Sequence, residues 1–284
     1  MSDFVSLLGV KGGPAIRPGS NMPTAILLRM GGRTILVDAG LGAARGVCDQ
    51  GVALTQIDMI LITHLHSDHY LELGPLLHTA WTAGLNRTVP VYGPPGTETY
   101  WQGFLASMAF DIELRIRDEG RPDLAQLVRF HTLEPGEVLN DDGLSVTALR
   151  NCHPPIEDSF ALRFDANGKA VVLSGDTAPL PGLAEFCAGA DLLVHEAMLT
   201  EGVDLLMQRM TNGDDRLRSH ILRSHTDAAD VGRLASEAGV KRLAINHMVP
   251  DGFAEFTEDD WRAKVRRHWD GPLEIGRDGM RLTL

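Results

Sequence analysis

Short apolar runs rich in β-branched residues alternate along this chain with segments whose apolar residues recur every three or four positions. The first kind of pattern predicts buried strands and the second predicts amphipathic helices. Strands are expected at 4–9, 25–30, 33–37, 57–62, 89–92, 144–149, 160–164, 170–173, 191–194 and 243–245, with two short strands in the tail. Helices are expected at 70–83, 97–110, 180–187, 198–219 (one helix, or a pair broken near Asn212-Gly213), 226–238 and 258–268.

Turn residues mark several boundaries between these elements. Gly31-Gly32 and Asn167-Gly168 each separate two apolar runs, which predicts two hairpins. Thr226 is expected to cap the start of a helix that ends at Gly239. The segment 112–136 has no clear period and is expected to mix strand and loop. Because strands and helices alternate in both halves, residues 1–284 are predicted to form one α/β domain.

Polar side chains gather just past the ends of the predicted strands. The densest group, His64, His66, Asp68 and His69, directly follows the run 57–62. His64 and His66 share a face if the chain stays extended there, and the next two residues can curl round to a second centre. A polar loop of solvated histidines is the simpler interpretation. Four potential ligands behind a buried strand favour a metal site instead.

Later strand ends add His153, Asp176 and His247, which brings the set to five imidazoles and two carboxylates. Two zinc ions that share one carboxylate would use all seven groups. Imidazole nitrogen and carboxylate oxygen suit zinc and its first-row neighbours, so manganese and iron remain alternatives.

These residues, in this order, resemble the metallo-β-lactamase superfamily, in which a His-x-His-x-Asp-His box is followed by His, Asp and His from later loops. The resemblance covers nearly the whole chain. It implies a four-layer αβ/βα sandwich of two mixed β-sheets flanked by helices. It also implies that His64, His66 and His153 hold one metal ion, that Asp68, His69 and His247 hold the other, and that Asp176 bridges them.

Three further stretches resemble the ribonuclease Z and phosphodiesterase branch of that superfamily. They are the glycine-rich 8–14, the box His195-Glu196-Ala197, and Ser224-His225-Thr226. The resemblance implies that His225 protonates the leaving oxygen while Glu196 orients it, and an imidazole held by a carboxylate is a competent acid near neutral pH. A polar pair with a purely structural role is the alternative, and it is favoured for His195.

The chain departs from ribonuclease Z in the interval between His153 and Asp176, which is too short for the basic arm that grips transfer RNA in that enzyme. The formal net charge is −12, from 26 basic and 38 acidic residues, and an acidic surface repels polyanions. A nucleic-acid substrate is therefore not expected. The apolar residues within 198–219 either form a lid over the metals or belong to the core.

The three cysteines show no paired spacing, which fits a reducing compartment. The sequence contains no signal-peptide pattern and no apolar run long enough to span a bilayer, so a cytoplasmic location without membrane attachment is expected. A homodimer is expected by analogy with the family.

The expected activity is hydrolysis of small phosphodiesters or related aryl esters by a hydroxide bridging two metals, which Asp68 could orient. A lactonase or carboxylic-ester hydrolase, which needs no imidazole acid, is the first alternative. An arylsulfatase-type activity is the second. A non-catalytic metal-binding scaffold is a third and less favoured alternative, because every ligand position is filled.

Overall fold

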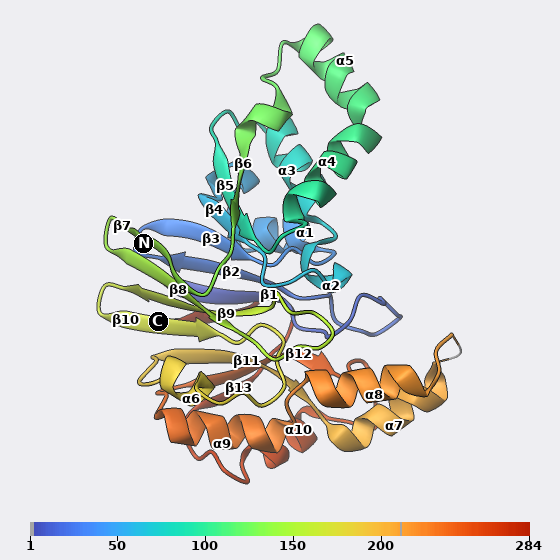
Figure 1. The fold of residues 1–284 in the computed structure, drawn as a ribbon, viewed down its shortest axis with the longest axis vertical. Helices are drawn as coiled ribbons and strands as arrows, with labels where there is room; N and C mark the ends of the chain where they lie inside the picture. The colour runs from blue at the N-terminus through green and yellow to red at the C-terminus, as the bar shows by residue number, and fades with distance from the viewer. Residues whose placement is uncertain (1–2, 211) are drawn as a thin grey trace.

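Two seven-stranded β-sheets lie face to face at the centre of the molecule (Figure 1). The computed structural model describes residues 3–210 and 212–284. Strands in the first sheet follow the order β14-β1-β2-β3-β4-β5-β6, and those in the second follow β13-β12-β11-β10-β9-β8-β7. In the order given, the first sheet has three antiparallel pairings followed by three parallel ones. The second sheet has three parallel pairings followed by three antiparallel ones. The predicted sandwich of two mixed sheets is confirmed.

The first sheet contains β1 (Phe4–Gly9), β2 (Ala25–Met30), β3 (Arg33–Val37), β4 (Met59–Leu61), β5 (Val89–Gly93), β6 (Val128–Thr132) and β14 (Met280–Thr283). The second contains β7 (Gly136–Asp141), β8 (Leu144–Arg150), β9 (Phe160–Ala166), β10 (Lys169–Leu173), β11 (Leu192–Met198), β12 (Leu243–Val249) and β13 (Leu273–Ile275). β1 pairs antiparallel with β14, so the two ends of the chain close one edge of the first sheet.

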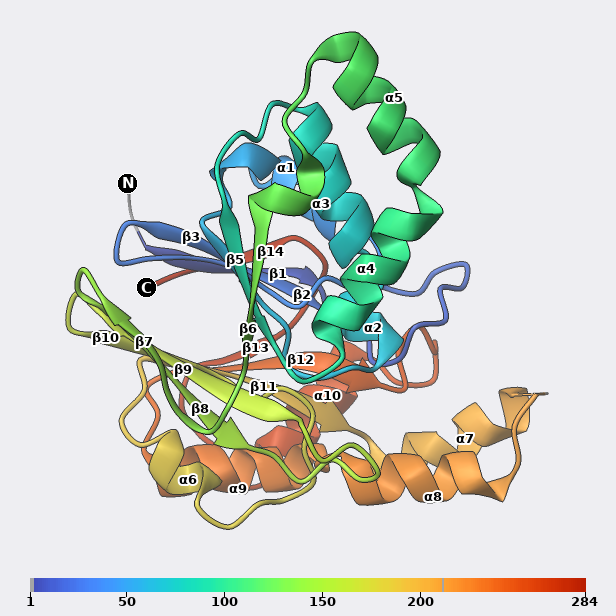
Figure 2. The ribbon, with the colours of Figure 1, turned by 45° about the horizontal axis from the view of Figure 1, so that its top comes forward.

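Helices cover the outer face of each sheet and one end of the sandwich (Figure 2). Those beside the first sheet are α1 (Ala43–Asp49), α2 (Ser67–Tyr70), α3 (Leu73–Thr82), α4 (Thr97–Ser107) and α5 (Ala109–Glu119). Those beside the second are α6 (Leu183–Phe186), α9 (Ala228–Ala238) and α10 (Glu258–Val265), while α7 (Thr200–Arg209) and α8 (Asp215–Ser224) form a hairpin that projects at one end. Two 3₁₀ turns, Leu54–Gln56 and Leu124–Leu127, complete the regular structure.

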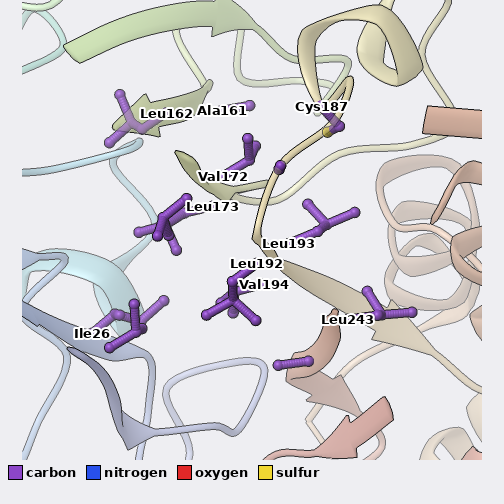
Figure 3. Close-up of a cluster of buried hydrophobic side chains, with 14 of the residues drawn as sticks. Ile26, Ala161, Leu162, Val172, Leu173, Cys187, Leu192, Leu193, Val194 and Leu243 are labelled. Carbon is purple, nitrogen blue, oxygen red and sulfur yellow. The ribbon is translucent and has the colours of Figure 1, made fainter. Parts of the chain in front are cut away.

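The core between the sheets is built from the inward-facing residues of both (Figure 3). Ile26 of the first sheet and Leu162, Leu173 and Val194 of the second belong to one cluster of buried side chains. Burial of each such side chain is worth about 1.5–3 kcal/mol, so this layer holds the two sheets together. The strand ends that carry the candidate metal ligands are fixed to this buried layer.

Most predicted elements lie where the apolar pattern placed them, and the differences have local causes. The segment 112–136 is not mixed strand and loop throughout, because its first part, up to Glu119, belongs to the helix α5. The surface of α5 is largely charged and exposed, so its sequence shows no helical period of apolar residues. Asp227, not Thr226, caps α9: its side chain accepts a hydrogen bond from the Ala229 amide. The segment 198–219 is a helix pair, broken as expected between α7 and α8. No helix of the described residues is long and apolar enough to cross a membrane.

Candidate metal centre and catalytic cavity

Seven buried or partly buried side chains converge where strands of both sheets end. His64 and His66 follow β4, and the short helix α2 turns Asp68 and His69 back toward the same space. From the second sheet, His153 follows β8 and Asp176 follows β10, while His247 lies within β12 at a positive φ of 40°. All seven residues singled out in the sequence are therefore brought together, although they are spread over 184 positions of the chain.

The first group of donors consists of His64, His66, His153 and Asp176, whose ligand atoms all lie within 4.8 Å of one another. The Nδ1 atom of His66 is 3.1 Å from His64 Nε2 and 3.0 Å from His153 Nε2. Zinc–nitrogen bonds of about 2.0–2.1 Å in a tetrahedral site separate donor atoms by slightly more than 3 Å. This spacing fits one divalent ion.

The second group consists of Asp68, His69 and His247. The Oδ2 atom of Asp68 is 3.3 Å from His247 Nε2 and 3.6 Å from His69 Nε2. Asp176 stands between the two groups, because its Oδ2 atom is 3.1 Å from His247 and 3.4 Å from His69 but also 3.7 Å from His64.

Two buried atoms at this position lack the hydrogen bonds that burial demands. Neither His69 Nε2 nor Asp176 Oδ1 has a partner among the described residues. Leaving a buried polar group unpaired typically costs about 1–3 kcal/mol, so such atoms call for an explanation. A metal ion would satisfy both, and the residues present therefore fit a metal centre.

The ring nitrogens of His69 and His153 that face away from the centre are held by the surrounding structure. Asp38, which has a φ of 60°, accepts a hydrogen bond from His69 Nδ1 at 2.7 Å and two more from Thr63. His153 Nδ1 donates to the carbonyl of Ser224 at 2.9 Å. Such supporting bonds fix the ring orientation and the tautomer of metal-binding histidines. Through these contacts Asp38 orients both the His69 ring and the Thr63 backbone.

Burial and mutual charge set the protonation of the cluster. Burial lowers the pKa of both His66 and His153 to about 4, which keeps these imidazoles neutral near pH 7. Burial alone would raise the pKa of Asp176, but His247, His69 and His64 outweigh it and hold that pKa well below its ordinary value. Neutral imidazoles and ionised carboxylates are the forms that bind metals.

The glycine-rich first loop positions the second group. The Gly13 amide donates to Asp68 Oδ2 at 2.7 Å, and the ammonium group of Lys11, which is 3% exposed, donates to the carbonyls of Gly12 and Gly13 at 2.8 and 2.5 Å. A Cβ atom on Gly12 would lie 2.9 Å from the His247 ring and 2.4 Å from Val249. Sequence reasoning identified this loop only by resemblance and missed its bond to Asp68, because the partners are 55 residues apart.

His225 and Glu196 meet beside the metal centre, as the resemblance implied. The Nδ1 atom of His225 lies 3.3 Å from Glu196 Oε2, and the other carboxylate oxygen accepts from the Thr226 amide at 2.9 Å. Burial would lower the pKa of His225, but the Glu196 carboxylate outweighs it and raises that pKa to about 9. His225 also groups with Asp176 and His247 as a possible ligand set.

His195 faces away from this centre, since neighbouring residues of a strand point to opposite faces. Its ring contacts the Glu196 carbonyl and lines a separate hollow next to α9. This placement agrees with the structural role favoured for it.

A cavity of about 280 Å³ opens over the metal-ligating residues. Its floor includes His66, Asp68, Asp176, His225 and His247. One wall is the loop 11–17 of the first sheet. The other is the face of the α7–α8 hairpin that carries Leu206, Met210, Leu217, His220 and Ile221. Arg17 and His220 are cavity residues that sequence reasoning did not select, because nothing in the local pattern marks them.

This fold and this centre define a metal-dependent hydrolase of the metallo-β-lactamase superfamily, phosphodiesterase-like in its relationships. The chain belongs to the family described as Anti-Pycsar protein Apyc1, whose model matches residues 5–247.

Relatives and solved structures agree with this assignment. A ribonuclease Z of Mycolicibacterium gilvum is 34% identical over 278 residues, which are 96% of this chain and 93% of the relative. The metallo-β-lactamase fold protein YhfI of Bacillus subtilis superposes with a TM-score of 0.72 over 99% of both chains at 22% identity. The short form of human tRNase Z superposes with a TM-score of 0.69, covering 99% of this chain and 98% of its own, at 21% identity. The resemblance to the ribonuclease Z-like branch is confirmed.

Proposed function

We propose that this chain is a dinuclear metal-dependent hydrolase of small phosphodiesters. His64, His66 and His153 hold one divalent ion, Asp68, His69 and His247 hold the other, and Asp176 bridges them. The observation that carries the proposal is the division of seven donors into two groups around one shared carboxylate. Zinc is the first choice of metal, and manganese or iron would suit the same ligands.

When bound, two such ions supply a water that is activated near neutral pH and polarise an ester oxygen. The residues of the chain then orient and protonate. Asp68, fixed by the Gly13 amide, holds the attacking water in line with the ester centre. His225 faces the cavity with Nε2, because its Nδ1 is directed to Glu196, and it protonates the departing oxygen.

The size of the cavity and the net charge of the chain support a small substrate. Its volume of about 280 Å³ suits a compact diester, and the chain carries a net charge of −12. The name of the mycobacterial relatives, ribonuclease Z, sits poorly with this expectation. These relatives align over more than nine-tenths of their own length, so the missing arm alone does not separate this chain from them. RNA is therefore the competing substrate to test.

The first experiment pairs metal analysis of the purified protein with initial rates on three substrates: bis-p-nitrophenyl phosphate, an aliphatic lactone and a precursor transfer RNA. About two metal equivalents and preference for the diester support the proposal. Preference for the lactone assigns the chain to the carboxylic-ester alternative, and cleavage of the RNA at comparable efficiency contradicts the small-substrate proposal. An aryl sulfate, run alongside, tests the sulfatase alternative. Bound metal with no turnover of any substrate supports the non-catalytic metal-binding scaffold, and little metal with no turnover contradicts the dinuclear centre itself.

Replacing His225 tests the proton transfer. His225→Ala should reduce the rate on an alkyl phosphodiester by about 10²–10⁴-fold, because a poor leaving group needs the proton, and should affect a nitrophenyl diester much less. Glu196→Gln keeps the shape of the orienting group and should show the same preference more weakly. Equal losses on both substrates would remove His225 from the role of acid.

We also propose that residues 1–284 act as one hydrolase domain that forms a homodimer. The joint contribution of both sheets to the centre supports a single unit. The exposed side chains of Phe110 and Leu114 on α5, 81% and 44% accessible, support an interface on that helix. Light scattering of the purified protein and of Phe110→Glu tests the dimer, which that variant should dissociate.

A further inference from the structure

Arg17 lies in the loop that forms one wall of the catalytic cavity. Among the described residues that line this cavity, Arg17 is the one arginine. Its partly buried guanidinium group donates through Nη2 to the sulfur of Met210 at 3.2 Å. Met210 directly follows α7, on the opposite wall. Within residues 3–210 and 212–284, no carboxylate pairs with Arg17.

A thioether is a weak hydrogen-bond acceptor, whereas a guanidinium group carries five N–H donors in a planar fork. The contact with Met210 therefore leaves most of the donor capacity of Arg17 unused. The two carboxylates of the cavity are engaged elsewhere, since Asp68 bonds the Gly13 amide and His247, and Asp176 lies among the histidines. An anion entering the cavity would meet a permanent positive charge with free donors.

The backbone holds Arg17 in place. Its amide donates to Ser20 Oγ and its carbonyl accepts from the Ser20 amide, both at 3.0 Å. Beyond this turn, Asp251 accepts two hydrogen bonds from Asn21, at 2.9 and 2.6 Å. The backbone at Arg17 is thus fixed before any ligand arrives, which lowers the entropic cost of binding.

We propose that Arg17 binds the anionic group of the substrate, using its fork for two oxygens of a phosphoryl group and giving up the contact with Met210. Arginine is suited to this task because its planar donors match phosphate oxygens in pairs. This inference rests on the proposed hydrolase function and adds a specificity residue to it: the substrate carries a negative charge, and neutral esters bind without this contribution. No bond is made or broken at Arg17.

A purely structural role is the competing explanation, in which Arg17 only ties the loop 11–17 to the α7–α8 hairpin through Met210. The two roles differ in what the side chain recognises. A binding role acts on charged ligands alone, whereas a tie acts on every substrate and on the exposure of the hairpin to proteases.

The test uses the metal-loaded, full-length protein and the variants Arg17→Gln and Arg17→Lys, with Arg267→Gln as the control, since Arg267 is exposed and lies outside the cavity. For each protein we would measure kcat and KM on bis-p-nitrophenyl phosphate and on the neutral ester p-nitrophenyl acetate. Calorimetry would give the affinity for inorganic phosphate, and metal content and limited proteolysis would report on the site and the hairpin.

Arg17→Gln should raise the KM for the diester and weaken phosphate binding by about tenfold to a hundredfold, the range for a hydrogen bond to a charged group. The neutral ester, the metal content and the proteolysis pattern should not change. Arg17→Lys, which keeps the charge but not the fork, should recover part of the loss, and Arg267→Gln should match the wild type.

Equal losses on charged and neutral esters, or faster cleavage of the hairpin, would overturn the proposal in favour of the structural tie. Unchanged phosphate affinity in Arg17→Gln would also overturn it. A wild-type protein that binds metal but does not hydrolyse the diester would refute the proposed function instead. The phosphate affinity of the two variants would still decide the role of Arg17.

Discussion

The floor and the hairpin wall of the catalytic cavity differ in how they are supported. The floor residues follow strands whose side chains fill the large core between the two sheets. The α7–α8 hairpin rests instead on a separate small cluster of Met198, Val203, Ile221 and Val249. Segments with few buried apolar contacts open at lower free energy than the core. The candidate metal ligands are therefore attached to the more stable core between the sheets, and the hairpin wall of the cavity belongs to a part that is expected to open at lower free energy.

The largest effect is expected from removing the charge at the centre of the floor. Asp176→Asn keeps the size of the side chain but cannot draw two metal ions together. Loss of a supporting partner alone costs about 10–100-fold in metal affinity or activity, so loss of this ligand should exceed that range. Metal analysis, diester turnover and circular dichroism would check it. A folded variant with two metals and normal turnover would show that Asp176 is not the bridge.

A smaller effect is expected when the stability of the metal-free protein is measured as a function of pH. The pKa of His153, which is 1% exposed, is lowered to about 4 by burial, whereas an unfolded histidine titrates near 6.5. As the pH falls from about 6.5 to 4, the unfolded chain binds a proton that the native chain does not. The free energy of unfolding should therefore fall over this window, by at most about 3 kcal/mol from this group.

Urea midpoints of the metal-free protein at pH 7.5, 6 and 5 measure this dependence. The wild type should lose stability more steeply than His153→Gln. The exposed His131 provides a control, and His131→Gln should follow the wild type. Parallel curves for wild type and His153→Gln would contradict the assignment.

The smallest effect is expected from matched valine substitutions, one in the large core between the sheets and one in the small cluster under the α7–α8 hairpin. Val171 lies in the large core and Val203 in the hairpin cluster, and both are completely buried. Val171→Ala should lower the global free energy of unfolding by about 1–3 kcal/mol. Val203→Ala should hardly change the global urea midpoint but should speed proteolysis within the hairpin and raise KM more than it lowers kcat. Equal global losses in the two variants would show that floor and hairpin unfold together.

The parts of the structure that the sequence predicted well are those fixed by neighbouring residues. The strands around the two predicted hairpins and the box from His64 to His69 follow from local pattern, and the seven ligand candidates follow from the position of polar residues after strands.

Two of the features that were missed depend on contacts between distant segments. The bond from Gly13 to Asp68 and the contact of Arg17 with Met210, 193 residues away, exist only once both sheets have formed. The helix α5 was missed for a local reason: its apolar residues Phe110, Ile112, Leu114 and Ile116 alternate with polar ones, a period typical of strands. Tertiary context, not local preference, decides the first two cases.

The pairing of β1 with β14 has a consequence for how the protein is made. Phe4 lies opposite Thr283, and the short strand β13 completes the other sheet only eight residues before that position. Asp278 additionally binds the amides of Val10 and Met22. On the ribosome, β1 must therefore wait until β14 has been synthesised before this edge is closed. Contacts of such long sequence separation form slowly and leave apolar strands exposed in the meantime. A nascent chain of this protein is accordingly expected to bind chaperones until β14 has left the exit tunnel.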